Sequence, residues 1–121
     1  MRACLPLDEG GRVAVSSRAK YMALGVLDGT SVAVEKVVEN PALNARERRP
    51  TFIRACREAG AQVVIAAHGS YCIPSALEAR RGRLRLLVGE GRPEDLRLRE
   101  AGAWEFIYSS LLATFERAKG H

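Results

Sequence analysis

The chain has 121 residues, 47% of them hydrophobic, so it can form one domain with a real core and leaves little for a second. Its formal charge of +5 comes mostly from arginine, which can attract phosphate groups but is a weak signal by itself. No segment approaches the roughly 20 apolar residues of a membrane span, and nothing resembles a secretory signal. We therefore expect a soluble, cytoplasmic protein.

The three cysteines, Cys4, Cys56 and Cys72, are odd in number and show no CxxC spacing. This argues against a disulfide framework and against a zinc knuckle. We expect reduced thiols, with Cys4 buried in a strand and Cys56 on the apolar face of a helix.

The first predicted strand covers residues 2–7 and ends at Asp8, where a pair of glycines marks a turn. A small, polar loop follows over residues 13–19 and carries Ser16 and Ser17. Asp8 is therefore expected at the carboxyl end of a strand.

Residues 21–27 and 31–38 are strand-like and flank Asp28-Gly29, the strongest short signal of a β-hairpin. A polar loop without periodicity then continues to Arg49. Pro50 suits the first position of a helix that ends at Gly60.

A buried strand is predicted at Val63, Val64 and Ile65, because this apolar run suits a parallel sheet covered on both faces. A turn at Gly69 and Ser70 leads into a helix over residues 73–79. His68, Ser70 and Cys72 therefore fall beyond the strand, where open α/β sheets bind their ligands.

Arginine alternates with leucine at the start of residues 83–88, which predicts an edge strand that is protected by charge. From Pro93 onward the pattern is predicted to be helical, with a break at Gly102 and an amphipathic helix over residues 103–119. The apolar stripe of that helix consists of Trp104, Ile107, Tyr108, Leu111, Leu112 and Phe115. Packing on the sheet is the simpler interpretation, and a homodimer interface is the alternative.

These elements predict an α/β fold: a single three-layer domain with a five-stranded mixed sheet and helices on both faces. The expected strand order is 3-2-1-4-5, with strand 2 antiparallel. The order reverses between the first and fourth strands, so Asp8 and His68 should face one another there. The expected ligand-binding residues at this switch point are Asp8, Ser16, Ser17, His68, Gly69 and Ser70.

Several short motifs, in this order and spacing, resemble the dinitrogenase iron-molybdenum cofactor biosynthesis family over about residues 1–92. They are Leu5-Pro6-Leu7-Asp8, Val15-Ser16, Arg18-Ala19-Lys20-Tyr21, Asp28-Gly29, Val37-Val38-Glu39-Asn40-Pro41 and Val63-Val64-Ile65-Ala66. The resemblance implies a ribonuclease H-like topology and a metal-cluster site at the switch point, with an iron-sulfur or iron-molybdenum cluster as cargo.

The chain departs from that family at its usual ligands. Members carry a His-Phe-Gly segment where Ser17 here joins Ser16 directly to Arg18, and the loop after Pro41 has neither His nor Cys. The glycine-rich turn expected after the fourth strand is replaced by residues 67–71.

The preferred hypothesis is a non-enzymatic binding or carrier domain, or an accessory domain, for a metal, a cluster or a small anion. His68 and Cys72 are the only soft ligands near one another, and Asp8 or a second subunit would have to complete the coordination.

Three alternatives stay open. Arg80, Arg81, Arg83 and Arg85 could recognise nucleic acid or another acidic partner, with help from Arg46, Arg48 and Arg49. Cys72 could act as a nucleophile with His68 as its base. A two-metal nuclease is disfavoured because only Asp8 and Glu9 lie at the right end of the sheet.

Overall fold

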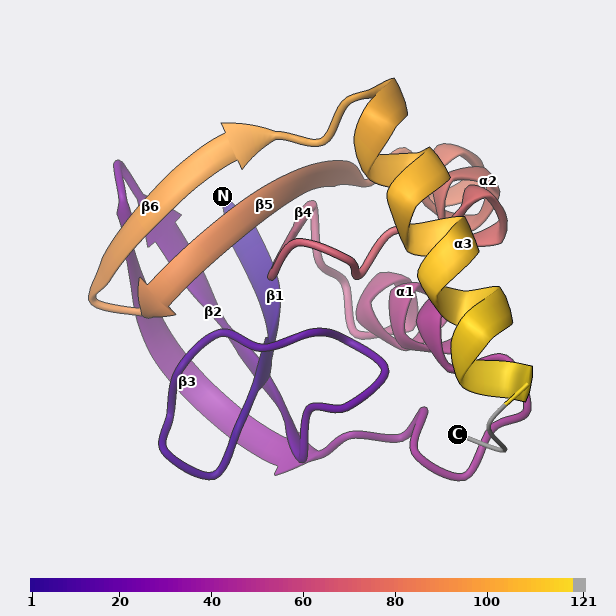
Figure 1. Cartoon of the computed structure of the whole chain (residues 1–121). Coiled ribbons are helices and arrows are strands. Elements are labelled where there is room, and N and C mark those ends of the chain that lie inside the picture. Colours follow the sequence, from indigo (N-terminus) through magenta and orange to yellow (C-terminus); the bar gives the residue numbers. More distant parts are fainter. Residues whose placement is uncertain (119–121) are drawn as a thin grey trace.

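The computed structural model describes residues 1–118, which form one mixed six-stranded sheet and three helices (Figure 1). The strands are β1 (Arg2–Leu7), β2 (Tyr21–Asp28), β3 (Ser31–Glu39), β4 (Val63–Ala66), β5 (Arg85–Arg92) and β6 (Asp95–Glu100). The helices are α1 (Arg48–Glu58), α2 (Ile73–Gly82) and α3 (Ala103–Ala118).

The strand order is β3-β2-β1-β4-β5-β6, so the predicted order of the first five strands is confirmed. β2 is antiparallel to β1 and β3, whereas β4 is parallel to both β1 and β5. The predicted hairpin closes at Asp28, which pairs with Ser31. The chain is a single α/β domain, consistent with a ribonuclease H-like fold.

The prediction of a helix directly after Pro93 is wrong, because residues 95–100 form β6 and pair antiparallel with β5. Polar and apolar residues alternate here, and Leu96 is buried while Arg97 is exposed. That period of two belongs to a strand with one covered face. β5 is therefore an inner strand, and its arginines do not protect an edge.

The two faces of the sheet are covered differently. On one face, Phe52 and Ile53 of α1 and Ala79 of α2 pack with strand residues in one core cluster. The second core cluster contains strand residues and Val13, but no helical residue among those described. The expected helices on both faces are thus replaced on this side by a curled sheet.

Two hydrogen bonds hold the curled edges of the sheet together. The Val32 amide donates to the Pro93 carbonyl over 2.6 Å, and the Leu96 amide donates to the Thr30 carbonyl over 2.8 Å. The hairpin of β2 and β3 therefore meets the hairpin of β5 and β6. Figure 1 shows the three helices grouped on the other side of the strands.

The expectation of three reduced thiols is wrong for two of them, since a disulfide joins Cys4 of β1 to Cys56 of α1. These residues are 52 positions apart, and both are fully buried in the helix-covered core. Sequence spacing could not reveal the pair, because the fold alone brings α1 onto β1. Cys72 is a free, buried thiol.

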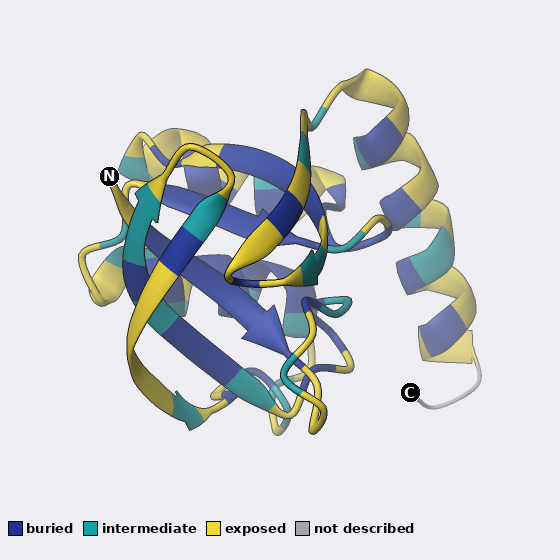
Figure 2. Cartoon of the chain, turned by 90° about the vertical axis from the view of Figure 1, so that its left-hand side faces the viewer, coloured by how far each residue is buried: buried dark blue, intermediate teal, exposed yellow. Residues whose placement is uncertain are grey.

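Helix α3 has its amphipathic faces reversed relative to the simpler prediction. Its buried residues are Glu105, Ser109, Ala113 and Glu116, whereas Trp104 is 82% and Leu111 68% exposed. Figure 2 shows buried bands on the side of α3 toward the domain and exposed bands on the outer side. The apolar stripe therefore does not pack on the sheet. Of the predicted range 103–119, position 119 lies outside the described residues.

No helix within residues 1–118 is both long enough and apolar enough to cross a membrane.

Candidate functional site

Two loops meet beyond the carboxyl ends of β1 and β4, at the predicted switch point. The Ser16 amide donates to Ser70 Oγ over 3.1 Å, and Ser16 Oγ donates to the Ser70 carbonyl over 3.2 Å. Asn40 joins them by donating to the carbonyls of Ser16 and Ala19, both over 3.0 Å. Both serines are fully buried, so these hydrogen bonds join the two loops in the interior of the protein.

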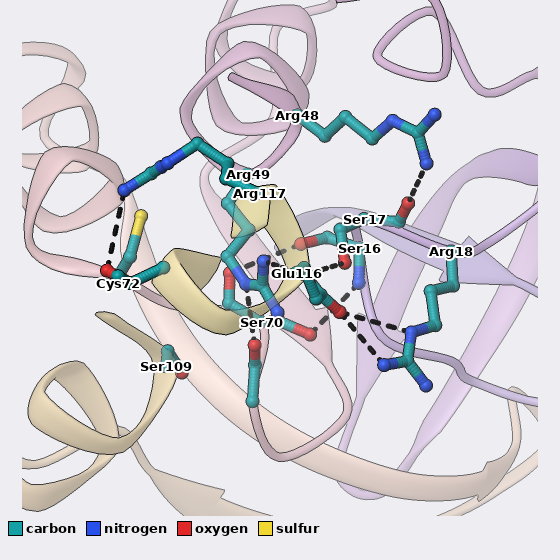
Figure 3. Close-up of polar contacts among 12 residues, drawn as sticks. Ser16, Ser17, Arg18, Arg48, Arg49, Ser70, Cys72, Ser109, Glu116 and Arg117 are labelled. Atoms are coloured by element: carbon teal, nitrogen blue, oxygen red, sulfur yellow. Dashed lines mark hydrogen bonds and ion pairs between the residues drawn. The ribbon is translucent and has the colours of Figure 1, made fainter. Parts of the chain in front are cut away.

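Glu116 of α3 lies beside these loops and is surrounded by hydrogen-bond donors from other segments (Figure 3). Arg49 Nη1 donates to Glu116 Oε1 over 2.6 Å, and Arg18 Nη2 donates to Oε2 over 2.9 Å. Ser17 Oγ also donates to Oε1, over 3.4 Å. Two segments that are distant in sequence, the loop of Ser17 and Arg18 and helix α1, thus converge on a carboxylate of a third segment.

Arg49 is the buried member of this group, with 3% exposure. Its Nε donates to the Gly69 carbonyl over 2.7 Å, while its buried Nη2 has no hydrogen-bond partner among the described residues. Nε of the neighbouring Arg48 is also buried without a partner, although Arg48 Nη1 donates to the Ser17 carbonyl over 3.2 Å. A buried guanidinium with an unused donor is unusual, because such groups are costly when unpaired.

Burial alone would raise the pKa of Glu116, but the hydrogen bonds and charges of Arg49 and Arg18 outweigh it and lower the pKa. Glu116 is therefore an anion at neutral pH. The local chemistry of the site is the binding of negative charge by guanidinium and hydroxyl groups.

A small cavity of about 20 Å³ lies beside this cluster, enough for about one water molecule. It is lined by Arg46, Glu47, Arg48, Arg49, Pro50, Cys72, Pro74, Ala113 and Arg117. Cys72 Sγ lies 3.2 Å from Ser75 Oγ inside the start of α2. The Cys72 thiol therefore lies in the region lined by arginines, and its polar contact is the Ser75 hydroxyl.

A second buried carboxylate, Glu105, lies at the other end of α3. Glu105 Oε1 is 2.6 Å from His68 Nδ1, and Oε2 accepts hydrogen bonds from the Gly69 amide over 2.7 Å and from Ser109 Oγ over 3.0 Å. Burial would raise the pKa of Glu105, but the Gly69, His68 and Ser109 hydrogen bonds prevail and lower it. The His68 ring also stacks on Tyr108, with centroids 4.1 Å apart.

Gly69 is required where the loop meets α3. Its φ is +96°, and a Cβ there would lie 3.0 Å from Leu112 Cδ2. The Gly69 amide binds Glu105 and its carbonyl binds Arg49, so one residue links the two carboxylate clusters.

No protein-family model matches the sequence, and no curated protein sequence matches it. The fold is similar to two solved structures. A crystal structure of PH0822 has a TM-score of 0.55 and 21% identity, with 76% of this chain and 80% of that chain covered. The apo form of the orange protein from Desulfovibrio gigas has a TM-score of 0.54 and 13% identity, with 98% of this chain and 88% of that chain covered.

These likenesses show a shared fold. The second covers nearly the whole chain, including the region beyond residue 92 that the motif resemblance did not reach. The site itself must be argued from the residues of this chain.

Four of the six predicted ligand-binding residues are brought together, namely Ser16, Ser17, Gly69 and Ser70. His68 lies at the Glu105 end of α3 instead. Asp8 accepts a hydrogen bond from the Arg12 amide, and the Val13 amide fastens this turn to Gly91 of β5. No contact recorded between residues 1 and 118 joins Asp8 to His68.

The predicted metal ligands His68 and Cys72 are engaged with Glu105 and Ser75, respectively. Within residues 1–118, no group of three or more His, Cys, Asp or Glu side chains could hold a metal ion. The soft-ligand pair therefore has no third ligand within the described part of this chain.

The functional residues that sequence reasoning missed are Arg18, Glu105 and Glu116, and Arg48 and Arg49 were considered only for nucleic acid. One signal was available: Glu105, Ser109 and Glu116 share a helix face that adjoins the apolar stripe. The amphipathic pattern predicts burial of the apolar stripe and says nothing of this polar face. Which face of the C-terminal helix is buried depends on the hydrogen-bond donors on the surface that it packs against. A sequence pattern does not show those donors.

Two of the four arginines in the basic cluster at the end of α2 pair with carboxylates. Arg81 lies 3.5 Å from Glu78, and Arg85 forms an ion pair with Glu100 of β6. Arg83 adopts the left-handed conformation that ends α2. The four arginines considered for nucleic acid thus lie on α2, on the residue that caps it and on β5.

Proposed function

We propose that this protein is a small binding or carrier domain for an anionic metal-sulfur cluster. The binding groups are Arg49, Arg18 and Ser17, and in the conformation described Glu116 takes the place of the anion. His68 and Cys72 are not the principal ligands in this proposal. The cluster is cargo, held by charge and hydrogen bonds.

The observation that carries the proposal is the buried guanidinium of Arg49 at the switch point. Within residues 1–118, the carboxylate that pairs with it is Glu116 of the separate helix α3, and its Nη2 has no hydrogen-bond partner. A guanidinium presents a planar fork of donors that suits the edge of an oxyanion or a sulfide-bridged anion. Open α/β folds bind their ligands at this location.

Two further observations support the choice of cargo. The motifs of the first 92 residues resemble a family of iron-molybdenum cofactor carriers and accessory proteins. The structural neighbour from Desulfovibrio gigas is described as an apo form, which implies that this neighbour also exists with something bound.

The test uses full-length protein purified without oxygen and incubated either with iron and sulfide or with tetrathiomolybdate as an anionic molybdenum-sulfur probe. Native mass spectrometry and visible absorption would report stoichiometry. We expect about one bound species per chain, and an affinity reduced at least about tenfold by Arg49→Gln or by the double variant Arg18→Ala Arg48→Ala. Arg85→Ala, on the far side of the sheet, is the control.

The double variant keeps the test decisive if Arg49→Gln folds poorly, because the side chain of Arg18 is 65% exposed and Arg48 is only half-buried, so neither belongs to the core. Undiminished binding by these variants would contradict the proposal. Loss of binding in His68→Ala Cys72→Ala alone would restore the soft-ligand hypothesis instead.

A further inference from the structure

The outer face of α3 is a large apolar surface. Its five exposed side chains are Trp104 (82% exposed), Leu111 (68%), Phe115 (59%), Ile107 (45%) and Tyr108 (45%). Figure 2 shows this outer side as exposed along the length of the helix. Soluble proteins scatter single exposed apolar residues over their surfaces, and five of them aligned on one helix mark an interaction surface.

Helix α2 extends this apolar surface. Ile73 and Leu77 lie one turn apart on α2, and each is 53% exposed. The Ile73 amide donates to Ser110 Oγ of α3 over 2.9 Å, so the two helices are fastened side by side. Leu77 and Phe106 line an open, largely apolar groove of about 420 Å³ between them.

We infer that two copies of this chain pair through the outer faces of α3 and α2. At about 150–250 Å² for each large side chain, these seven at their observed exposures present roughly 600–1,000 Å². The largest patch on an ordinary monomer is about 300–600 Å², whereas a stable interface takes about 800 Å² from each partner. The patch thus has the size of one side of a dimer.

The composition of the patch also favours a second copy. Between Trp104 and Phe115 the one charged residue of α3 is Glu105, and its carboxylate is buried on the inner face. Interface cores are depleted of charge and enriched in Trp, Tyr and Phe, and a two-fold pair matches one patch to itself. A helix that binds membrane surfaces carries Lys and Arg on its exposed polar face, but the polar face of α3 is turned inward with two glutamates.

The pairing leaves the polar face of α3 on the switch point. Each side of α3 thus makes a different contact. Glu105 and Glu116 bind it to its own domain, and the apolar stripe binds the second copy. This explains how an inverted amphipathic helix is stable, because its apolar face is covered in the dimer.

The test compares wild-type protein with Leu111→Glu in sedimentation velocity over a range of concentrations. Wild type is expected to be dimeric at micromolar concentration, and Leu111→Glu at least about 30-fold weaker in dimerisation, as for a central interface residue. Val37→Glu is the matched control, since Val37 is 50% exposed but lies on β3. Circular dichroism checks that both variants keep the fold.

Trp104 gives a second readout because it is the only tryptophan in the chain. Its fluorescence should shift to the blue and resist acrylamide quenching as wild type dimerises, while Leu111→Glu keeps an exposed, quenchable Trp104. A wild type that stays monomeric, a dimer that survives Leu111→Glu, or a monomer that sediments with anionic vesicles would each overturn the inference.

Discussion

Glu105 and Glu116 lie on the same buried face of α3, eleven residues or about 16 Å apart, but different chemistry holds each of them. Glu105 accepts from a backbone amide, a serine, a histidine and the guanidinium of Arg99, whose side chain is 55% exposed. Glu116 accepts from two guanidiniums and a hydroxyl, and a free anion could satisfy these equally well. The first cluster therefore fastens the helix, and the second resembles an occupied ligand site.

This difference suggests how a carrier domain could keep its site intact without cargo. A buried arginine costs several kcal/mol without a counter-ion. A carboxylate on a terminal helix offsets that cost and can be displaced, while the Glu105 end stays attached. The following four predictions test the difference between the two ends, from the largest effect to the smallest.

Glu116→Ala should lower the free energy of unfolding by about 3 kcal/mol, because it leaves Arg49 buried without a counter-charge. Millimolar molybdate, phosphate or thiomolybdate should restore much of that loss by binding in its place. Urea unfolding with and without the anion measures both effects. Chloride at equal ionic strength is the control, and a loss that no anion restores would contradict the ligand-site interpretation.

Glu105→Ala should cost about 2–3 kcal/mol, since the Gly69 amide loses its acceptor in a buried position. No small anion should restore this loss, because the buried donors left behind are the Gly69 amide and the Ser109 hydroxyl, while the guanidinium at this end, Arg99, is 55% exposed. The same unfolding assay measures it. Restoration as complete as in Glu116→Ala would mean that the two ends are equivalent.

Acidification should unfold the protein through both carboxylates. Their pKa values are lowered in the folded state, so their contribution is complete above the unfolded value of about 4.5 and is lost as the pH falls below it. Each group contributes a slope of up to about 1.4 kcal/mol per pH unit in that window. Glu105→Gln and Glu116→Gln should each flatten the acid limb of stability against pH, and equal slopes in wild type and variants would contradict this.

Arg18→Ala and Arg99→Ala should have the smallest effects, below about 1 kcal/mol each, because these side chains are 65% and 55% exposed. They still differ in function: Arg18→Ala should weaken anion binding, and Arg99→Ala, at the Glu105 end, should not. Calorimetric titration with the same probe distinguishes them. Equal weakening by both variants would mean that charge alone attracts the anion.

Much of the fold could be predicted from local patterns. The Asp28-Gly29 hairpin, the apolar run of β4 and the turn at Gly69 are each specified by neighbours in sequence, and so is the order of the first five strands. β6 was missed because its six residues follow a proline and alternate only briefly. The disulfide was missed because a separation of 52 residues carries no local signal.

The sequence predicted the location of the candidate site and its loop residues, but not its charged residues. The position beyond β1 and β4 and the meeting of Ser16 with Ser70 follow from the strand order. Arg18, Arg49 and Glu116 come from three elements, and their convergence depends on where α3 lies.

By itself, the sequence determined the first five strands, the switch point and the existence of an amphipathic C-terminal helix, because these depend on spacing within a few residues. Only the tertiary structure decided which face of that helix is buried. Two glutamates found buried donors at Arg49 and Gly69, and those hydrogen bonds outweighed the burial of an apolar stripe. A buried hydrogen bond requires a particular donor and acceptor, whereas hydrophobic periodicity shows only that a helix face tends to be buried against some other surface.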